Sequence, residues 1–290
     1  MTAIIELLAG GFSLSVELWP PRSPETQVRL ERSLERLAVL KPTFASITYG
    51  AAGSTRERTH DLVVAIHESK MMTPMAHLVC AAHQRDELET ILERYKASGI
   101  ENVLALRGDP PLGATEGLRE GDLRYAIELV DLAKELGNFC VAVGAHPEGH
   151  PNATDLATDR RYLAEKLDHA DFAITQFFFR SEDYFSLVRD LADLGMGKPV
   201  IPGIMPITNV KTVSRMAELS GTELPEEILK RIHTVADDPD QVHRVGVEIA
   251  TELCTELLAQ GVPGLHFYTM NQVSATLEVC ANLDLVQRER

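Results

Sequence analysis

The stretch Phe12-Ser13-Leu14-Ser15-Val16-Glu17-Leu18 sets the pattern that the rest of the chain repeats. Its apolar residues alternate with small or polar ones, which is typical of a β-strand with two different faces. A segment with helical periodicity, Ser23–Leu37, follows, and a second apolar run then extends from Phe44 to Tyr49. This strand–helix–strand order predicts two parallel strands joined by a helical crossover.

The same unit recurs along the whole chain. The eight expected strands are Phe12–Leu18, Phe44–Tyr49, Met75–Cys80, Val103–Leu106, Cys140–Ala145, Phe172–Phe179, Val200–Ile204 and Leu265–Tyr268. The expected helices between them are Ser23–Leu37, Thr55–His67, Arg85–Ala97, Asp122–Leu136, Thr158–His169, Ser181–Leu194 and Asn209–Leu219. A residue able to do chemistry lies at or just past each strand end. This alternation predicts an α/β fold, a (β/α)8 TIM barrel, with a catalytic rim at the strand ends.

The connection between the seventh and eighth expected strands is longer than the others. It holds a helix at Pro225–Thr234 and a long amphipathic helix that runs through Val245–Leu257. No linker-like composition separates this insert from the barrel. We therefore expect one catalytic domain over residues 1–290, with an elaborated arm between strands seven and eight.

Composition limits the classes of function. The chain is 44% hydrophobic and 24% charged, and 43 acidic residues against 28 basic ones give a net charge of −15. This charge argues against nucleic-acid binding, which needs a basic surface, but it leaves small anionic ligands possible. No apolar stretch reaches the length of a membrane span, and the N-terminus lacks a signal-peptide pattern. We expect a cytoplasmic protein with four reduced cysteines, which are Cys80, Cys140, Cys254 and Cys280.

Glu17 is the first candidate for catalysis. Strand alternation places it opposite Leu14, Val16 and Leu18, towards the barrel interior or its mouth. Trp19 and the Pro-Pro turn after it would shield the carboxyl from water, which raises its pKa and suits a general acid. A structural carboxylate paired with Arg22 or another base at a strand end is the alternative, and the residues alone favour neither.

Two further strand ends carry candidate polar groups. Asp109 follows Arg107-Gly108, where the glycine permits a close backbone approach, and it either projects over the top face or caps the next loop. Gln176 lies before three phenylalanines, and its amide can pair with a planar heterocycle. Some of these phenylalanines are expected to be plain core residues.

Several other patterns point away from common cofactors. His146 and His150 have the spacing of a metal pair, but two prolines and a glycine exclude a helix there, so we expect the rings not to share a face and no metal to bind. No G-x-G-x-x-G motif occurs, so a nicotinamide nucleotide would not bind in a Rossmann unit. No lysine ends a strand, which argues against a Schiff-base aldolase or lyase.

Eight motifs in order resemble those of the 5,10-methylenetetrahydrofolate reductase family over nearly the whole chain. They are Val16-Glu17-Leu18-Trp19-Pro20-Pro21-Arg22, Ser46-Ile47-Thr48-Tyr49-Gly50-Ala51, Arg58-Thr59-His60, Leu106-Arg107-Gly108-Asp109, Pro147-Glu148-Gly149-His150-Pro151, Thr175-Gln176-Phe177-Phe178-Phe179, Ile201-Pro202-Gly203-Ile204-Met205-Pro206 and His266-Phe267-Tyr268-Thr269-Met270-Asn271. The resemblance implies a (β/α)8 barrel that reduces methylenetetrahydrofolate to 5-methyltetrahydrofolate, in one-carbon metabolism and methionine supply.

The resemblance also implies roles for individual residues. Glu17 would protonate the leaving nitrogen of the folate ring, and Asp109 would contact the pterin and stabilise the developing cation. The residues implied to bind the folate are Gln176, Thr48, Tyr49, Phe178, Tyr268 and Gln272. Those implied to bind the nucleotide are Thr48, His77, Arg107, Gly108, His146 and Lys166.

Some positions depart from the pattern that holds FAD in most of the family. Tyr125-Ala126, Asp159 and Lys166 are kept, but His146, Tyr162 and Glu165 replace a tyrosine, an asparagine and an arginine. A glutamate beside a pyrophosphate replaces attraction with repulsion. We therefore expect no bound FAD and a direct transfer of hydride from NADH or NADPH, with NADH favoured. Binding of FAD through rearranged contacts is the alternative.

Two departures concern the folate, since Val210 replaces a phenylalanine and Gln272 replaces an arginine that would meet the glutamyl carboxylate. A folate-binding barrel without catalysis is the hypothesis of another class, and the retention of Glu17, Asp109 and Gln176 argues against it. The helix around Val245–Leu257 could supply the interface of a homo-oligomer.

Overall fold

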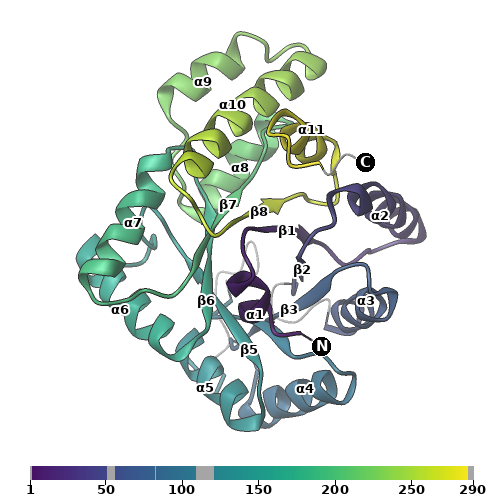
Figure 1. The fold of residues 1–290 in the computed structure, drawn as a ribbon, viewed down its shortest axis with the longest axis vertical. Coiled ribbons are helices and arrows are strands. Elements are labelled where there is room, and N and C mark those ends of the chain that lie inside the picture. The colour runs from purple at the N-terminus through teal and green to yellow at the C-terminus, as the bar shows by residue number, and fades with distance from the viewer. Residues whose placement is uncertain (1, 51–55, 82, 109–120, 287–290) are drawn as a thin grey trace.

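Eight parallel strands close into a barrel in the computed structural model, which describes residues 2–50, 56–81, 83–108 and 121–286 (Figure 1). Each strand pairs with the next in the sequence, and β8 pairs back with β1. The strands are β1 (Ser13–Leu18), β2 (Phe44–Ile47), β3 (Thr73–Val79), β4 (Asn102–Leu106), β5 (Cys140–Ala145), β6 (Phe172–Phe177), β7 (Val200–Ile204) and β8 (Gly264–Tyr268). The predicted (β/α)8 barrel is confirmed.

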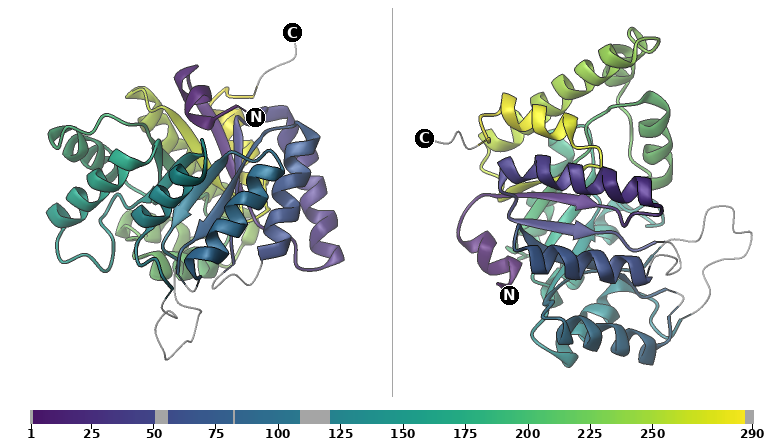
Figure 2. Two further views of the ribbon diagram at one scale, coloured as in Figure 1. Left: turned by 90° about the horizontal axis from the view of Figure 1, so that it is seen from below. Right: turned by 90° about the vertical axis from the view of Figure 1, so that its right-hand side faces the viewer.

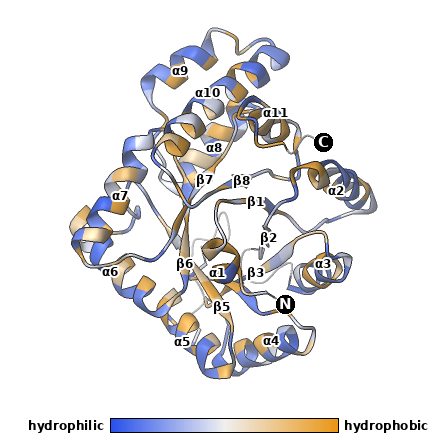
Figure 3. Ribbon diagram, in the orientation of Figure 1, coloured by the Kyte–Doolittle hydropathy of each residue, from blue (hydrophilic) through white to orange (hydrophobic). Residues whose placement is uncertain are grey.

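Helices surround the barrel as an outer ring (Figure 1). Those that follow the first six strands are α2 (Pro24–Leu37) with the short 3-10 helix η1 (Ala38–Leu40), α3 (Arg56–Ser69), α4 (Arg85–Ala97), α5 (Ala126–Leu136), α6 (Leu156–His169) and α7 (Ser181–Asp193). Hydrophobic and hydrophilic segments alternate around these helices (Figure 3). In α2, for example, Leu30, Ser33 and Leu37 are buried at helical spacing, and Ser23 caps the first turn. The apolar face of each helix therefore covers the outward side chains of the strands.

A short helix, α1 (Ile4–Ala9), closes the end of the barrel at which the strands begin (Figure 2). Its Ile4 and Leu8 are buried against inward side chains of several strands, among them Phe44, Met75 and Phe172. The backbone N–H of Ile4 donates to Asn102 Oδ1 over 2.8 Å at the start of β4. This plug leaves the opposite end, where the strands finish, as the place for polar groups. The sequence pattern did not predict α1.

The connection from β7 to β8 holds three helices, α8 (Val210–Ser220), α9 (Glu226–His233) and α10 (Pro239–Ala259), and α11 (Ser274–Asn282) follows β8. These helices form the upper lobe in Figure 1. Gly246 of α10 packs against the backbone of Ile207, and a Cβ there would lie 1.7 Å from the Ile207 carbonyl oxygen. The insert is therefore seated directly on the end of β7. No helix among the described residues is long and apolar enough to cross a membrane.

Several expected element ends shift by a few residues. Phe12 is 45% exposed and precedes β1, while Phe178 and Phe179 lie beyond the end of β6. The helix expected from Asp122 begins at Ala126, because Glu128 accepts from the backbone N–H of Arg124 and Tyr125 and so caps the helix there. The helix α11 was not predicted. None of these shifts changes the order of strands and helices.

Candidate active site at the strand ends

Glu17 lies at the end of β1 with its carboxyl inside the barrel mouth. Its side chain is 13% exposed, and the indole N–H of Trp19 donates to Oε1 over 3.2 Å. Burial raises the pKa of Glu17 from 4.5 to about 7, and the bond from Trp19 opposes this only in part. Among the ion pairs of the described residues, none joins Glu17 to Arg22. The carboxyl thus has the environment of an acid that keeps its proton near neutral pH.

His77 of β3 faces Glu17 across the barrel. Its Nε2 lies 3.7 Å from Glu17 Oε2, and its side chain is 7% exposed. This buried Nε2 has no hydrogen-bond partner within the described residues. Burial lowers the pKa of His77 to about 3, so the imidazole is neutral.

A polar layer lies beneath these two residues. His266 of β8 contacts Ser15 Oγ through Nδ1 at 2.9 Å and Ser46 Oγ through Nε2 at 3.3 Å. Its ring stacks on Phe44, and burial lowers its pKa to about 3. The sequence analysis did not single out Ser15 or Ser46. Since Ser15 is two residues from Glu17 on one strand, the period of two could have placed it on the same face.

Tyr268 stands beside this layer at the end of β8. Its hydroxyl donates to the backbone carbonyl of Thr175 over 2.6 Å, and its ring centroid lies 5.3 Å from that of His266. Gly203 of β7 makes room for the ring, because a Cβ there would lie 2.5 Å from Tyr268 Cε2. Burial raises the pKa of Tyr268, and the Glu17 charge adds to the effect. The structure therefore brings Tyr268 and Glu17 together.

Gln176 lies where the pairing between β6 and β7 is irregular. The register shifts between Ile174 and Phe177, and the Gln176 side-chain oxygen accepts from the Phe177 N–H over 3.0 Å. The side-chain oxygen of Gln176 is thereby held at the strand end. The assignment of Phe178 to a substrate surface is not supported, because its ring is 1% exposed and stacks on Tyr184 in the core.

Thr48 and Tyr49 follow β2 on the same rim. The Thr48 carbonyl accepts from the hydroxyl of buried Thr59, which fixes the backbone after the strand. The Tyr49 hydroxyl lies 3.2 Å from His83 Nε2, and burial raises the pKa of Tyr49 to about 12. The ring is 8% exposed, so Tyr49 mainly supports the rim.

Arg107 and Gly108 follow β4. The Arg107 carbonyl accepts from the Ala81 N–H over 2.9 Å, which joins two neighbouring strand ends, while its side chain is exposed. Gly108 has a φ of +90°, and a Cβ there would lie 3.1 Å from Val79 Cβ. Asp109, the second predicted catalytic carboxyl, lies outside the described residues.

His146 begins the loop after β5, and this loop corrects one expectation. The rings of His146 and His150 are in edge contact, with centroids 4.7 Å apart, although we expected the prolines and Gly149 to keep them on different faces. Gly149, at a φ of +93°, donates from its N–H to the His146 carbonyl, and the resulting turn brings the rings together. Within the described residues no group of three or more potential ligands could hold a metal.

Arg160 of α6 anchors this loop and was missed by the sequence analysis. It is 3% exposed and donates to the carbonyls of His146 and Pro147 over 2.9 and 2.5 Å, as well as to Asp159 and Asp190. An arginine in an exposed-looking helix gives no sequence signal of such a role. The loop that carries His146 is therefore fixed by one buried guanidinium.

Replacement of Arg160 by methionine is expected to lower the free energy of unfolding by about 2 kcal/mol, because buried carbonyls and carboxylates lose their donor. Urea unfolding monitored by circular dichroism measures this change. The exposed neighbour Arg161, which bonds Thr158, provides the matched control, and Arg161→Met should leave stability within about 0.5 kcal/mol. Equal losses in the two variants would contradict the anchoring role.

The remaining residues that the sequence singled out lie on α6, in the turn after β8 and in the insert. Lys166 of α6 donates from Nζ to the Gly144 carbonyl over 2.8 Å, and burial lowers its pKa to about 8. Gln272 is exposed in the turn after β8. Tyr162 is 67% exposed and Glu165 is also exposed, so both stand on the outer side of α6. Val210 packs partly buried against the core of the insert.

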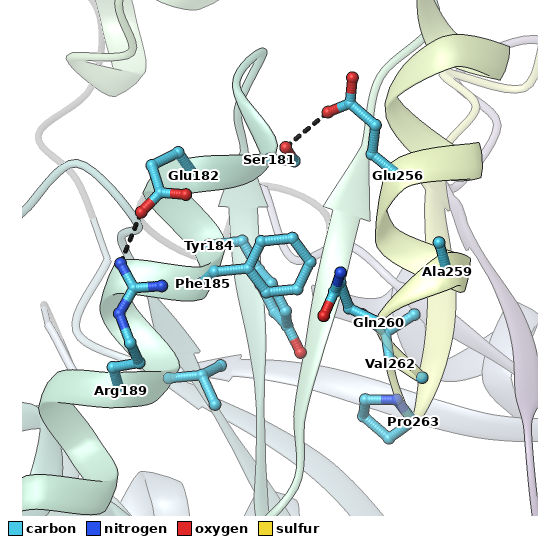
Figure 4. A pocket seen from close by; sticks show the side chains of 12 residues that line it. Ser181, Glu182, Tyr184, Phe185, Arg189, Glu256, Ala259, Gln260, Val262 and Pro263 are labelled. Carbon is cyan, nitrogen blue, oxygen red and sulfur yellow. Dashed lines mark hydrogen bonds and ion pairs between the residues drawn. The ribbon is translucent and has the colours of Figure 1, made fainter.

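A groove of about 770 Å³ lies between α7 and the end of α10, away from these strand ends. Arg189 donates to Glu182 along α7, and Ser181 donates to Glu256 of α10 across the groove (Figure 4). It contains none of the predicted site residues and lies in the outer helical layer. The polar groups at the barrel mouth therefore remain the candidate active site.

Comparison with solved structures supports the fold. A protein from Clostridium thermocellum, described as binding two copies of 5-methyl-5,6,7,8-tetrahydrofolic acid, superimposes with a TM-score of 0.64. The match covers 98% of this chain and 99% of that one at 14% identity. At this identity the likeness establishes a shared fold.

Sequence comparison identifies the family. The 5,10-methylenetetrahydrofolate reductase of Salmonella typhimurium is 37% identical over 275 residues, which cover 94% of this chain and 91% of that protein. Methylenetetrahydrofolate reductase (NADH) 1 of Arabidopsis thaliana is 34% identical, and the chain spans half of its length. The family model described as methylenetetrahydrofolate reductase matches residues 1–284. With the acid Glu17 in the barrel mouth, these matches mean that the chain belongs to the methylenetetrahydrofolate reductase family.

Proposed function

We propose that this protein reduces 5,10-methylenetetrahydrofolate to 5-methyltetrahydrofolate with NADH as the hydride source, and so supplies methyl groups to one-carbon metabolism and methionine synthesis. The observation that carries the proposal is the Glu17 carboxyl, which is buried at the barrel mouth with a pKa of about 7. Family membership and the NADH named for the plant relatives support it.

In the proposed reaction, Glu17 transfers its proton to the leaving nitrogen of the folate imidazolidine ring. That carbon–nitrogen bond breaks, and the remaining nitrogen forms an iminium with the exocyclic carbon. Hydride from NADH adds to this carbon, which gives the methyl group and NAD⁺. Gln176 would hydrogen-bond the pterin, Tyr268 would border it, and Asp109 would face the developing cation. Thr48, Arg107, Gly108 and His146 would line the nucleotide's side of the mouth.

The described residues of α6 support a reaction without the FAD that most of the family carries. Two basic side chains of α6 already bind protein groups. Lys166 donates to the carbonyl of Gly144 in β5, and Arg160 is buried among carbonyls and carboxylates. A pyrophosphate beside α6 would find Lys166 and Arg160 already engaged in protein hydrogen bonds, and the exposed Glu165 adds negative charge on the outer side of this helix. We therefore propose that hydride passes directly from the nicotinamide to the folate.

Retention of Tyr125-Ala126 favours the second candidate, in which FAD relays the hydride. One experiment separates the two. The purified protein is inspected for flavin absorbance, and NADH oxidation with methylenetetrahydrofolate is then followed anaerobically with and without added FAD. A colourless protein with full activity in the absence of FAD supports direct transfer. A yellow protein, or activity only with FAD, contradicts it.

A folate-binding barrel without catalysis is the candidate of another class. The same assay tests it, because such a protein would bind the folate yet oxidise no NADH under either condition. Titration of the folate by calorimetry then separates an inactive binder from a misfolded sample. Retention of the Glu17 acid in a desolvated site argues for catalysis, since folate binding alone needs no proton donor.

The pH dependence of kcat/KM follows from the raised pKa of Glu17. The protonated carboxyl is the active form, so activity should be constant below about pH 7 and fall about tenfold per unit above it. Initial rates measured over this range with saturating NADH provide the test. A profile that stays flat well above neutral pH would exclude Glu17 as the proton donor.

A further inference from the structure

The barrel mouth contains one buried polar atom that the described residues leave without a partner next to a reacting group. His77 Nε2 is this atom, and it lies 3.7 Å from Glu17 Oε2. The two side chains come from β3 and β1 and are 7% and 13% exposed, so little water reaches the space between them. A buried unpaired imidazole nitrogen is costly, which calls for a partner at some stage of the reaction.

The two oxygens of Glu17 have different neighbours. Oε1 accepts from the Trp19 indole over 3.2 Å, whereas Oε2 faces only His77 among the described donors. The other titratable groups that face this carboxyl are Tyr268, whose hydroxyl is committed to the Thr175 carbonyl, and His266, which lies beneath and contacts two serines. His77 is therefore the described group free to respond to the charge on Oε2.

We propose that His77 is a positioning residue for the acid Glu17, whose carboxylate it stabilises by donating a hydrogen bond from Nε2–H to Oε2 as the proton leaves for the substrate. The proposal rests on the proposed function and deepens it. The distance of 3.7 Å shortens to a hydrogen bond when Glu17 becomes a carboxylate, with or without ligand, because the negative charge on Oε2 attracts the Nε2–H donor. Glu17 gives up its proton to the substrate nitrogen, and His77 keeps its own proton throughout.

This role differs from that of a nucleotide contact, which the family resemblance implies for His77. A contact to the nucleotide would change the KM for NADH and leave the acid unaffected. A donor to Oε2 lowers the pKa of Glu17 and makes it a stronger acid, because it stabilises the charged form. Removal of the donor should therefore raise the pH at which kcat begins to fall. It should also lower the maximum value of kcat.

Two variants at the same position test the proposal. His77→Leu removes the donor and keeps an apolar side chain, while His77→Gln can place an amide NH2 near the Nε2 position. The control is His60→Leu, because His60 is another imidazole whose ring nitrogens lack hydrogen-bond partners in the described structure, and it stacks on Tyr95 outside the barrel mouth. The readouts are the pH profile of kcat, the KM for NADH, and infrared titration of the Glu17 carboxyl without ligands.

We expect the Glu17 titration midpoint in His77→Leu to rise by about one pH unit and kcat to fall about tenfold or more. His77→Gln should recover most of both, and the KM for NADH should change by less than about twofold. His60→Leu should leave the midpoint unchanged. An unchanged midpoint in both His77 variants overturns the proposal, whether or not the KM for NADH rises.

The infrared titration also keeps this inference separate from the proposed function. If the wild-type protein does not oxidise NADH, the proposed reaction fails, but the carboxyl band still titrates and still reports the effect of His77. The band is identified by its absence in Glu17→Gln. A shifted Glu17 midpoint in the His77 variants, together with no turnover by the wild type, would support the interaction between His77 and Glu17. It would contradict only the proposed reduction of the folate.

Discussion

Replacement of Glu17 by glutamine is expected to reduce kcat by a factor of about 10² to 10⁴, because the amide cannot supply the proton that opens the folate ring. The shape of the side chain is kept, and the Trp19 indole can still donate to the amide oxygen at the position of Oε1. Binding of methylenetetrahydrofolate should therefore change little. Rapid-mixing measurement of NADH oxidation gives the rate, and calorimetry gives the affinity.

Glu17→Asp is the matched control for this loss. It retains an ionisable carboxyl on a shorter side chain, so it should recover part of the activity if proton donation is the role of Glu17. A Glu17→Gln variant that turns over at the wild-type rate would disprove general-acid catalysis by this residue. In that case the proton would have to come from another source.

The same variant should be more stable than the wild type at alkaline pH. The pKa of Glu17 rises from 4.5 to about 7 on folding, so the folded protein holds a proton that the unfolded chain releases between these values. The free energy of unfolding of the wild type therefore falls as pH rises through this window. The Glu17→Gln variant does not lose this stability, because the amide does not ionise. We expect a gain of up to about 3 kcal/mol for Glu17→Gln at pH 8 and little difference at pH 4. Such a gain would exclude unfolding as the cause of lost activity.

Replacement of Gly246 by alanine is expected to lower the free energy of unfolding by about 3 kcal/mol. The added Cβ would lie 1.7 Å from the Ile207 carbonyl oxygen and 2.6 Å from its carbonyl carbon, and both are backbone atoms that cannot rotate away. Helix α10 would have to move off the end of β7. Chemical denaturation with urea, followed by circular dichroism, measures the loss.

A loss of stability in Gly246→Ala would distinguish this packed glycine from a glycine in an exposed helix. In an exposed helix interior, a change from glycine to alanine usually stabilises by about 1 kcal/mol. Gly197 offers the control, since it is exposed and a Cβ there meets nothing within 4 Å. Gly197→Ala should therefore leave stability almost unchanged. A Gly246→Ala protein as stable as the wild type would mean that α10 is not held against Ile207 as described.

The strand order and the inward direction of Glu17 were predictable from the sequence, because both depend on local periodicity. Alternation along Ser13–Leu18 fixes which side chains enter the barrel, and each following helix forces the next strand to be parallel. The expected helix starts at Ser23 and Asn209 were also predictable, since both residues cap their helices in the structure. The eight motifs added the family, which the sequence comparisons confirmed.

Other features required the tertiary structure because they join residues that are distant in the chain. The plug formed by α1 depends on inward side chains from several strands, and the role of Arg160 depends on carbonyls of another loop. The contact between His146 and His150 depends on a turn that residue spacing did not reveal. No local pattern encodes such meetings.

The sequence by itself determined the barrel, the placement of polar residues at its strand ends and the identity of Glu17 as the candidate acid. Only the tertiary structure decided how that acid behaves. Its raised pKa comes from burial within the closed barrel, and its neighbour His77 arrives from β3. The physical reason is that periodicity acts over a few residues, whereas desolvation and the distance between side chains are set by the packing of the whole fold.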